Sequence, residues 1–148
     1  MVVVPNVRYV TAQDETIWRD LWRSYLTFYE TKRDEEVYAE TWRRINDPNE
    51  QMFSMVAETP EGVVIGIVNF LQHRHFWSCQ DYIYLNDLYV CTNARRMGAG
   101  KAIIDAVVNH AKDHNCEQVW WFTAEDNLTA RKLYDGVATL SPFMKYQI

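Results

Sequence analysis

The 148-residue chain has few of the residues that mark disulfide-rich or zinc-binding proteins. Its three cysteines, Cys79, Cys91 and Cys116, are widely spaced and form no CxxC pair. An odd, scattered set of this kind argues against a disulfide framework and against a cysteine zinc site. We therefore expect reduced thiols in an intracellular protein, cytoplasmic or, in a eukaryote, nuclear.

Long apolar runs and an excess of positive charge are also absent. No stretch of about 18 apolar residues could span a bilayer, and the first ten residues lack the basic segment of a secretory signal. Lys and Arg number 15 against 20 Asp and Glu, a net charge of -5. This balance argues against a nucleic-acid partner and suits a cationic one, while the lack of a long apolar run argues against a membrane partner.

Apolar and aromatic residues are plentiful. Hydrophobic residues make up 48% of the chain and aromatic residues 14%, with six Trp and nine Tyr. Such a composition excludes disorder and leaves large side chains to line a pocket. No repeat or linker divides the sequence, so we expect one domain over residues 1–148.

Hydrophobic periodicity predicts the order β, α, α, β, β, β, α, β, α, β. The expected strands are 7–10, 52–58, 63–72, 82–90, 118–123 and 142–148, and the expected helices are 14–30, 37–45, 99–114 and 127–137. A hairpin-rich half thus precedes a β-α-β-α half. This order predicts an α/β (α+β mixed) fold with helices flanking a mixed sheet, and a parallel crossover between strands 82–90 and 118–123.

Residues 88–101 predict an anion site. A strand enters a short loop, and the loop opens a helix with two glycines and three basic residues. The first N–H groups of a helix lack partners, so this arrangement suits a phosphate or pyrophosphate. A plain strand-to-helix turn with glycines for tight packing would have the same residues. A P-loop is excluded because GxxxxGK[ST] is absent, and Ile103 stands where a dinucleotide fingerprint needs a small residue.

The hexapeptide Arg95-Arg96-Met97-Gly98-Ala99-Gly100 resembles the R/Q-x-x-G-x-G/A motif of the GNAT superfamily of acyl-coenzyme A-dependent N-acetyltransferases. The resemblance extends to 86–90 and 127–134 and covers nearly the whole chain. Segments 18–30 and 66–77 are also similar to the fungal histone and polyamine acetyltransferases and their bacterial relatives. The resemblance to the GNAT superfamily implies a central mixed, mostly antiparallel sheet with splayed middle strands and about four flanking helices.

The resemblance also implies acetyl-CoA as co-substrate and no metal. The pyrophosphate would lie on the loop amides from Arg96 to Lys101, and the pantetheine arm along 88–90. The cofactor-binding residues implied in this way are Leu88, Tyr89, Val90, Arg95, Arg96, Met97, Gly98, Ala99, Gly100, Lys101, Asn127, Ala130 and Tyr134. Asn127 and Tyr134 are seven residues apart and share a helix face. A helix N-cap and a core aromatic are the alternative roles of these two residues.

Attack of an amine on a thioester needs a deprotonated amine, a stabilised oxyanion and a protonated leaving thiolate. Tyr134 is the candidate general acid, because a phenol with a pKa of about 10 is protonated at neutral pH. By resemblance, a backbone N–H near Tyr89 would stabilise the oxyanion. Covalent catalysis through Cys91 is disfavoured because no partner histidine can be placed beside it.

The general base and the acceptor residues are less clearly marked. Relatives in the polyamine branch often have Glu at the position of Asn86, which cannot accept a proton at neutral pH. Asp87 is then the candidate base, directly or through water, with a structural hydrogen-bond acceptor as the alternative. Neighbouring strand residues face opposite sides, so Asn86 and Asp87 share a face only if a bulge intervenes. Glu30 and Asn86 are candidate substrate contacts, although a solvated run of charges explains Glu30 and its acidic neighbours equally well.

These patterns favour an N-acetyltransferase that moves an acetyl group from acetyl-CoA to a primary amine by direct attack in a ternary complex. The expected acceptor is a small-molecule or peptide amine: a polyamine, an amino acid or a basic peptide or histone lysine. A non-catalytic acyl-CoA-binding module and a phosphate-ligand regulatory protein are the alternatives. By resemblance to relatives that associate through a C-terminal strand, segment 142–148 predicts a homodimer or higher homo-oligomer.

Overall fold

A computed structural model of the chain describes residues 4–95 and 97–148 and contains five strands and four α-helices. Two short 3-10 turns, η1 and η2, precede α1 and α3. In chain order the elements are β1 (Asn6–Tyr9), η1 (Ala12–Asp14), α1 (Glu15–Phe28), α2 (Glu35–Ile45), β2 (Met52–Glu58), β3 (Val64–His73), β4 (Tyr82–Val90), η2 (Thr92–Ala94), α3 (Ala99–Asp113), β5 (Gln118–Trp120) and α4 (Leu128–Val137).

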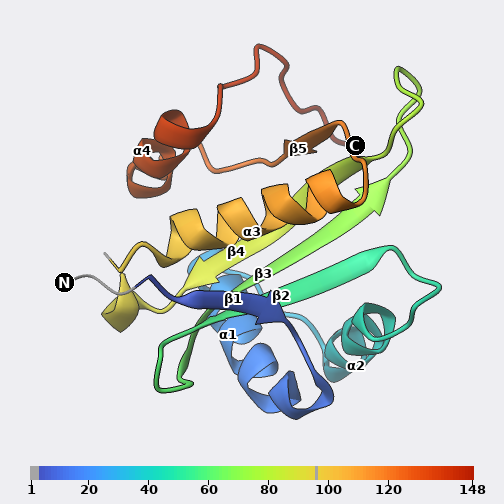
Figure 1. Cartoon of the computed structure of the whole chain (residues 1–148). Coiled ribbons are helices and arrows are strands. Elements are labelled where there is room, and N and C mark those ends of the chain that lie inside the picture. The colour runs from blue at the N-terminus through green and yellow to red at the C-terminus, as the bar shows by residue number, and fades with distance from the viewer. Residues whose placement is uncertain (1–3, 96) are drawn as a thin grey trace.

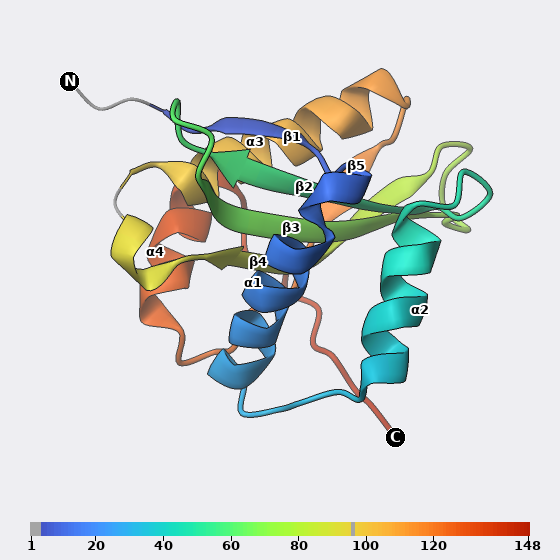
Figure 2. The same ribbon diagram turned by 90° about the horizontal axis from the view of Figure 1, so that it is seen from below.

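The strands form one sheet in the order β1-β2-β3-β4-β5 (Figure 1). Neighbouring strands are antiparallel except β4 and β5, which run parallel because α3 connects them across one face. Helices α3 and α4 cover that face, and α1 and α2 cover the other (Figures 1 and 2). The predicted mixed, mostly antiparallel sheet with four flanking helices is confirmed.

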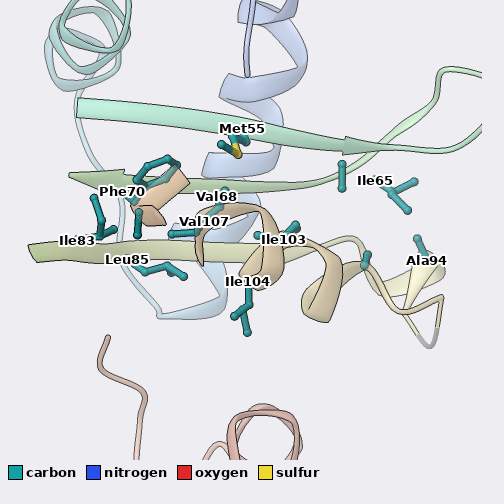
Figure 3. Packing of buried hydrophobic residues seen from close by; sticks show 13 residues of the cluster. Met55, Ile65, Val68, Phe70, Ile83, Leu85, Ala94, Ile103, Ile104 and Val107 are labelled. Carbon is teal, nitrogen blue, oxygen red and sulfur yellow. The ribbon is translucent and has the colours of Figure 1, made fainter. Parts of the chain in front are cut away.

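Two hydrophobic clusters hold the helices on the sheet. On the α3 face, Ile103, Ile104 and Val107 pack over apolar side chains of β2, β3 and β4 (Figure 3). On the other face, Trp18, Trp22 and the residues around them pack against β2 and β3. Burial of one large apolar side chain contributes about 1.5–3 kcal/mol, so these clusters account for the attachment of both helical layers.

A bulge in β4 changes which side chains face α1. Asn69 pairs with Asp87 while the next residue, Phe70, pairs with Leu85, which leaves Asn86 as the extra residue. Before the bulge, Leu85 packs into the cluster under α3; after it, Asp87 faces the α1 side. The extra residue therefore reverses the alternation of the strand and brings a carboxylate onto the α1 face.

Strands β4 and β5 pair only over a short distance. The pairing runs from Tyr82 opposite Gln118 to Tyr84 opposite Trp120, while β4 continues to Val90. This confirms the predicted splay of the two middle strands. We refer to the space between residues 85–90 and the segment that follows Trp120 as the β4–β5 opening.

Several expectations about element boundaries need correction. The strand predicted over 118–123 ends at Trp120, because the following residues turn away from β4. The strand predicted over 142–148 is absent from the described chain, and that segment is exposed throughout. Pro142 has no N–H for a ladder, and a strand requires a partner. The helix predicted from residue 14 begins as η1, with α1 proper starting at Glu15.

Among the described residues, no helix is long and apolar enough to cross a membrane.

Candidate active site

The edge of β4 that faces the β4–β5 opening carries main-chain hydrogen-bonding groups. Cys91 donates its N–H to the carbonyl of Ile65 on β3 at 2.8 Å. Because such pairs alternate along an antiparallel ladder, Tyr89 also faces β3, whereas Leu88 and Val90 direct their N–H and C=O groups toward the opening. An extended ligand arm can pair with these groups as an added strand would. Of the main-chain N–H groups near Tyr89, those of Leu88 and Val90 point to the opening, and that of Tyr89 itself does not.

The loop that opens α3 uses its two glycines differently. Gly98 is the N-cap of α3 and has a φ of +77°, in the left-handed region that glycine adopts without strain. A Cβ there would meet no atom within 4 Å, so the space in front of the loop is open. At Gly100, a Cβ would lie 2.9 Å from Leu133 Cδ2. Gly98 thus shapes the anion loop, and Gly100 allows α4 to approach α3.

The described side chains of this loop divide into exposed basic groups and packed apolar ones. Arg95 is exposed, and Lys101 pairs with Asp105 at 2.9 Å. Met97 and Ala99 pack against the core, so they offer main-chain groups only. Arg96, which was predicted to contact the cofactor, lies outside the described residues. The N–H groups at the start of α3 remain the structural basis of the anion site.

A shallow groove of about 540 Å³ runs between α1 and the end of β4. It is lined by Asp20, Arg23, Ser24, Thr27, Phe28, Tyr89, Thr92 and Arg95. The groove joins the outer side of α1 to the segment that leads into the anion loop. It therefore brings two guanidinium groups to the same side of the molecule as the end of β4.

Asp87 is the centre of a buried hydrogen-bond network. Its Oδ2 accepts from Trp22 Nε1 and from Asn69 Nδ2, both at 3.1 Å, and its Oδ1 accepts from Asn86 Nδ2 at 2.7 Å. The residue is 8% exposed. Three N–H donors hold a carboxylate in one orientation, and each bond to a charged group contributes about 1.5–3 kcal/mol. The structure therefore gives Asp87 a structural role, whether or not it also acts as the base.

The network continues away from Asp87 and joins α1 to three strands. Trp18 donates its Nε1–H to Ser54 Oγ on β2 at 3.1 Å and to Asn69 Oδ1 on β3 at 3.0 Å. Ser54 in turn donates to Asn69 Oδ1 or to the carbonyl of Val68. Polar groups inside a core are stable only when they are paired in this way. The pairing fixes the position of α1 over the bulge of β4.

Tyrosines that the sequence interpretation did not assign to the site surround this carboxylate. Burial, and next the charge of Asp87, raise the pKa of Tyr25 and of Tyr84. The rings of Tyr25 and Tyr29 lie 5.0 Å apart on the last turns of α1. The sequence did contain a signal: Trp18, Trp22, Tyr25 and Tyr29 fall on the sheet-facing side of one helix, and all four have a polar tip that needs a partner when buried.

Tyr134 has the protonation state that a general acid requires. Burial raises the pKa of its hydroxyl, and Tyr29 adds to that shift, so the phenol stays protonated at neutral pH. The ring also packs edge-on against Trp121, with centroids 5.3 Å apart. Asn127, two turns earlier, caps α4 because its Oδ1 accepts the N–H of Ala130 at 3.4 Å. Both alternative roles, packing and capping, are thus observed.

The other predicted residues have less distinctive surroundings. Glu30 is exposed just after α1, in a groove that is also lined by Thr27, Thr31 and Lys32. Burial raises the pKa of the half-buried Cys91, which keeps it a thiol and disfavours nucleophilic catalysis.

The histidines that share a face of α3 form no metal centre. The rings of His110 and His114 stack with centroids 3.9 Å apart, and Ala111 occupies the position where an HExxH site needs glutamate. Over 4–95 and 97–148, no cluster of three or more His, Cys, Asp or Glu side chains is placed to hold a metal ion.

The described features fit one kind of ligand: an extended arm pairing with Leu88 and Val90, ending in a diphosphate at Gly98 and the start of α3. A reactive group at the other end of that arm would lie in the β4–β5 opening, which Tyr134 and the network of Asp87 border. Fold and site together define an acyl-coenzyme A-dependent acyltransferase.

Comparisons with known proteins agree with this class. The sequence pattern of the Acetyltransferase (GNAT) family matches residues 15–136. D-amino-acid N-acetyltransferase HPA3 of Saccharomyces cerevisiae is 34% identical over 133 residues, which cover 89% of this chain and 83% of that protein. The chain therefore belongs to the GNAT acetyltransferase family, and acetyl-CoA is its co-substrate.

Solved structures share the fold. A probable acetyltransferase superposes with a TM-score of 0.85 at 18% identity, covering 97% of this chain and 96% of that one. AAC(6')-Iy, in complex with the bisubstrate analogue CoA-S-monomethyl-acetylneamine, superposes with a TM-score of 0.83 at 17% identity and 99% coverage of both chains.

Proposed function

We propose that the protein acetylates the amino group of an amino acid, using acetyl-CoA in a ternary complex. The observation that carries the proposal is the edge of β4 left unpaired beyond Tyr84, with the protonated Tyr134 packed on Trp121 in the segment that follows β5. The amino-acid acceptor is supported by the similarity to a D-amino-acid N-acetyltransferase over most of both chains.

The geometry supports direct transfer. Amides of the Gly98 loop bind the diphosphate, and main-chain groups of Leu88 and Val90 pair with the pantetheine arm. The thioester carbonyl then accepts a hydrogen bond from a main-chain N–H of β4. The neutral amine attacks the carbonyl carbon, the C–S bond breaks, and the leaving thiolate takes the proton of Tyr134. The new amide nitrogen loses its extra proton to a base.

Asp87 is our candidate for that base, acting directly or through one water. Its Oδ1 accepts one hydrogen bond, from Asn86, and so has lone-pair capacity left. The carboxylate faces α1, on the side where Tyr25 and Tyr84 surround it. The same charge favours the approach of an ammonium group before it loses its proton.

The test is a thiol-release assay with acetyl-CoA against a panel of both enantiomers of the amino acids, polyamines and a lysine peptide. We expect turnover with amino acids and a mass increase of one acetyl group on the amine. Turnover with polyamines alone would overturn the acceptor class. Thermal stabilisation by CoA without turnover on any amine would instead support a non-catalytic acyl-CoA-binding module.

We also infer that the chain forms a homodimer. The segment after α4 exposes large apolar side chains, Leu140, Phe143, Met144, Tyr146 and Ile148, each at least 73% exposed. Exposed apolar groups gathered on one segment mark a protein interface, and a second copy of the chain offers the same segment in return. Sedimentation of the full chain and of a chain ending at residue 139 tests this; a full chain that sediments as a monomer would refute it.

A further inference from the structure

Six ring side chains form a layer on the sheet face that also carries α1 and α2, at the β4–β5 end. We call this layer the aromatic shelf; it consists of His73, His75, Tyr82, Tyr84, Trp120 and Phe122. The rings come from the end of β3, the start of β4 and the region of β5. α1 packs over β3 and β4 and α2 over β2, so the rings extend beyond the helical layer.

The shelf is rigid because its rings stack and bond to one another. His75 lies parallel to Tyr82 with centroids 4.1 Å apart, and Tyr84 stacks on Trp120 at 4.3 Å. Trp120 donates its Nε1–H to His73 Nε2 at 2.9 Å. Phe122 completes the shelf edge-on to Trp120 at 5.3 Å. Stacked and edge-on pairs are the favourable aromatic geometries, so the layer is preformed.

The shelf is continuous with the active site but is not part of the core. Phe122 is 50% exposed, and the other five rings are half-buried. Tyr84 belongs to the shelf and also senses the charge of Asp87, which adds to the effect of burial in raising its pKa. An acceptor amine held near Asp87 would therefore have the rest of its chain directed along these rings.

One cation already lies on the shelf. The ammonium nitrogen of Lys145, in the segment after α4, is 5.1 Å from the centroid of the Phe122 ring. This distance is within the range over which a cation is attracted to the face of a ring. A carboxylate adds to the attraction: Glu117 accepts a hydrogen bond from the Tyr82 hydroxyl at 2.7 Å, and the whole chain carries a net charge of -5.

We propose that the aromatic shelf binds a second cationic group of the acceptor, an ammonium or guanidinium several bonds from the reacting amine, and that Lys145 occupies its place in the absence of acceptor. The inference deepens the proposed function, because it narrows an amino-acid acceptor to one with a basic side chain. Phe122 is the specificity-determining residue, since its ring holds the ammonium group of Lys145.

Arginine and norleucine test the proposal, in whichever enantiomer the panel identifies. Each has one amine that can be acetylated, the α-amine, and an unbranched side chain. Only arginine carries a second cation. We expect kcat/KM for arginine to exceed that for norleucine by roughly 3- to 30-fold, the range for a cation on a ring. Phe122→Leu should bring the ratio close to one, because it lowers kcat/KM for arginine more than for norleucine. Phe76→Leu is the matched control, because Phe76 is 107% exposed in the β3–β4 loop, and it should keep the ratio.

A ligand that cannot react separates this proposal from the proposed function. Pentyltrimethylammonium should bind the CoA-loaded protein in a calorimeter, more weakly after Phe122→Leu and more tightly after Lys145→Gln, which vacates the ring. The shelf proposal fails if Phe122→Leu leaves both the arginine preference and this binding unchanged. Preference for phenylalanine over arginine, lost in Phe122→Leu, would show that the shelf stacks aromatic acceptors instead. Absence of turnover on every amino acid, with the ammonium still bound, would reject the proposed function alone.

Discussion

The indole Nε1 of Trp22 and the carboxylate Oδ2 of Asp87 lie 3.1 Å apart and join α1 to the bulge of β4. The bond exists because Asn86, the extra residue of the bulge, turns the next side chain to the α1 face. It links the position of the first helix to the position of the carboxylate beside the opening. A change at either residue should therefore be felt in both stability and activity.

Trp22→Phe keeps an aromatic side chain but removes the N–H donor, and the smaller ring also fills less of the buried site. The buried carboxylate then loses one of its three N–H partners, which should cost about 1–3 kcal/mol in the free energy of unfolding. Urea denaturation measures the cost. Trp77→Phe is the control, because Trp77 is 82% exposed and should change stability very little. Equal effects of the two substitutions would contradict the importance of the bond.

Tyr134→Phe should lower kcat by roughly 10²- to 10⁴-fold, the usual contribution of a positioned proton donor. Binding of CoA should persist, because the ring and its packing on Trp121 remain. The pKa of the hydroxyl is raised, so the unmodified enzyme should lose activity through this group only above about pH 10. Tyr146→Phe, at a 93% exposed tyrosine, is the control. A variant at Tyr134 with unchanged kcat across pH would remove this residue from the acid role.

The elements with strong local signals were predictable from the sequence. β2 and β4 have the predicted bounds, 52–58 and 82–90, because alternating apolar residues and the turn at Gly62 define the hairpin and its neighbour. Glycines at 98 and 100 likewise marked the start of α3, which begins at the predicted Ala99. In each case a few adjacent residues carry the whole signal.

What depended on long-range pairing was not predictable. The bulge at Asn86 follows from a one-residue register shift against β3, and nothing in the residues of β4 alone requires it. Asp87 is 65 residues from Trp22 in sequence, so their bond appears only in the fold. The aromatic shelf gathers residues of three strands in the same way. Segment 142–148 has apolar residues typical of a strand, but the single chain provides it no partner.

Gly98→Ala and Gly100→Ala should have different effects. An alanine at position 100 would place its Cβ 2.9 Å from Leu133 Cδ2, so the end of the half-buried Leu133 side chain must shift, which should cost about 1 kcal/mol in stability. Adding Leu133→Ala should recover part of that loss. An alanine at Gly98 meets open space but a left-handed backbone, so it should reshape the loop and weaken CoA binding. Calorimetry and thermal denaturation of the variants measure both effects; rescue of Gly98→Ala by the Leu133 substitution would contradict this division.

His110 should make the protein less stable in acid. Its side chain is 2% exposed beneath Phe53 and Phe70, and its Nε2 is buried without a partner among the described residues. Burial, and next the charge of His114, lower the pKa of His110 from 6.5 to about 4. The unfolded chain therefore binds this proton more tightly than the folded one, so the stabilising effect is complete above about pH 6.5 and is lost as the pH falls toward 4.

Protonation of His110 should lower the free energy of unfolding by about 3 kcal/mol at most, since one unit of pKa corresponds to about 1.4 kcal/mol. His110→Phe should flatten the dependence of unfolding free energy on pH between about 6.5 and 4. Tyr9, whose hydroxyl bonds His110 Nδ1, is 47% exposed and can bond water instead. His114→Gln should keep most of the slope, because the exposed His114 contributes less to the shift than burial does. Urea denaturation at stepped pH values distinguishes the two variants, and an unchanged slope in His110→Phe would show that other groups cause the acid sensitivity.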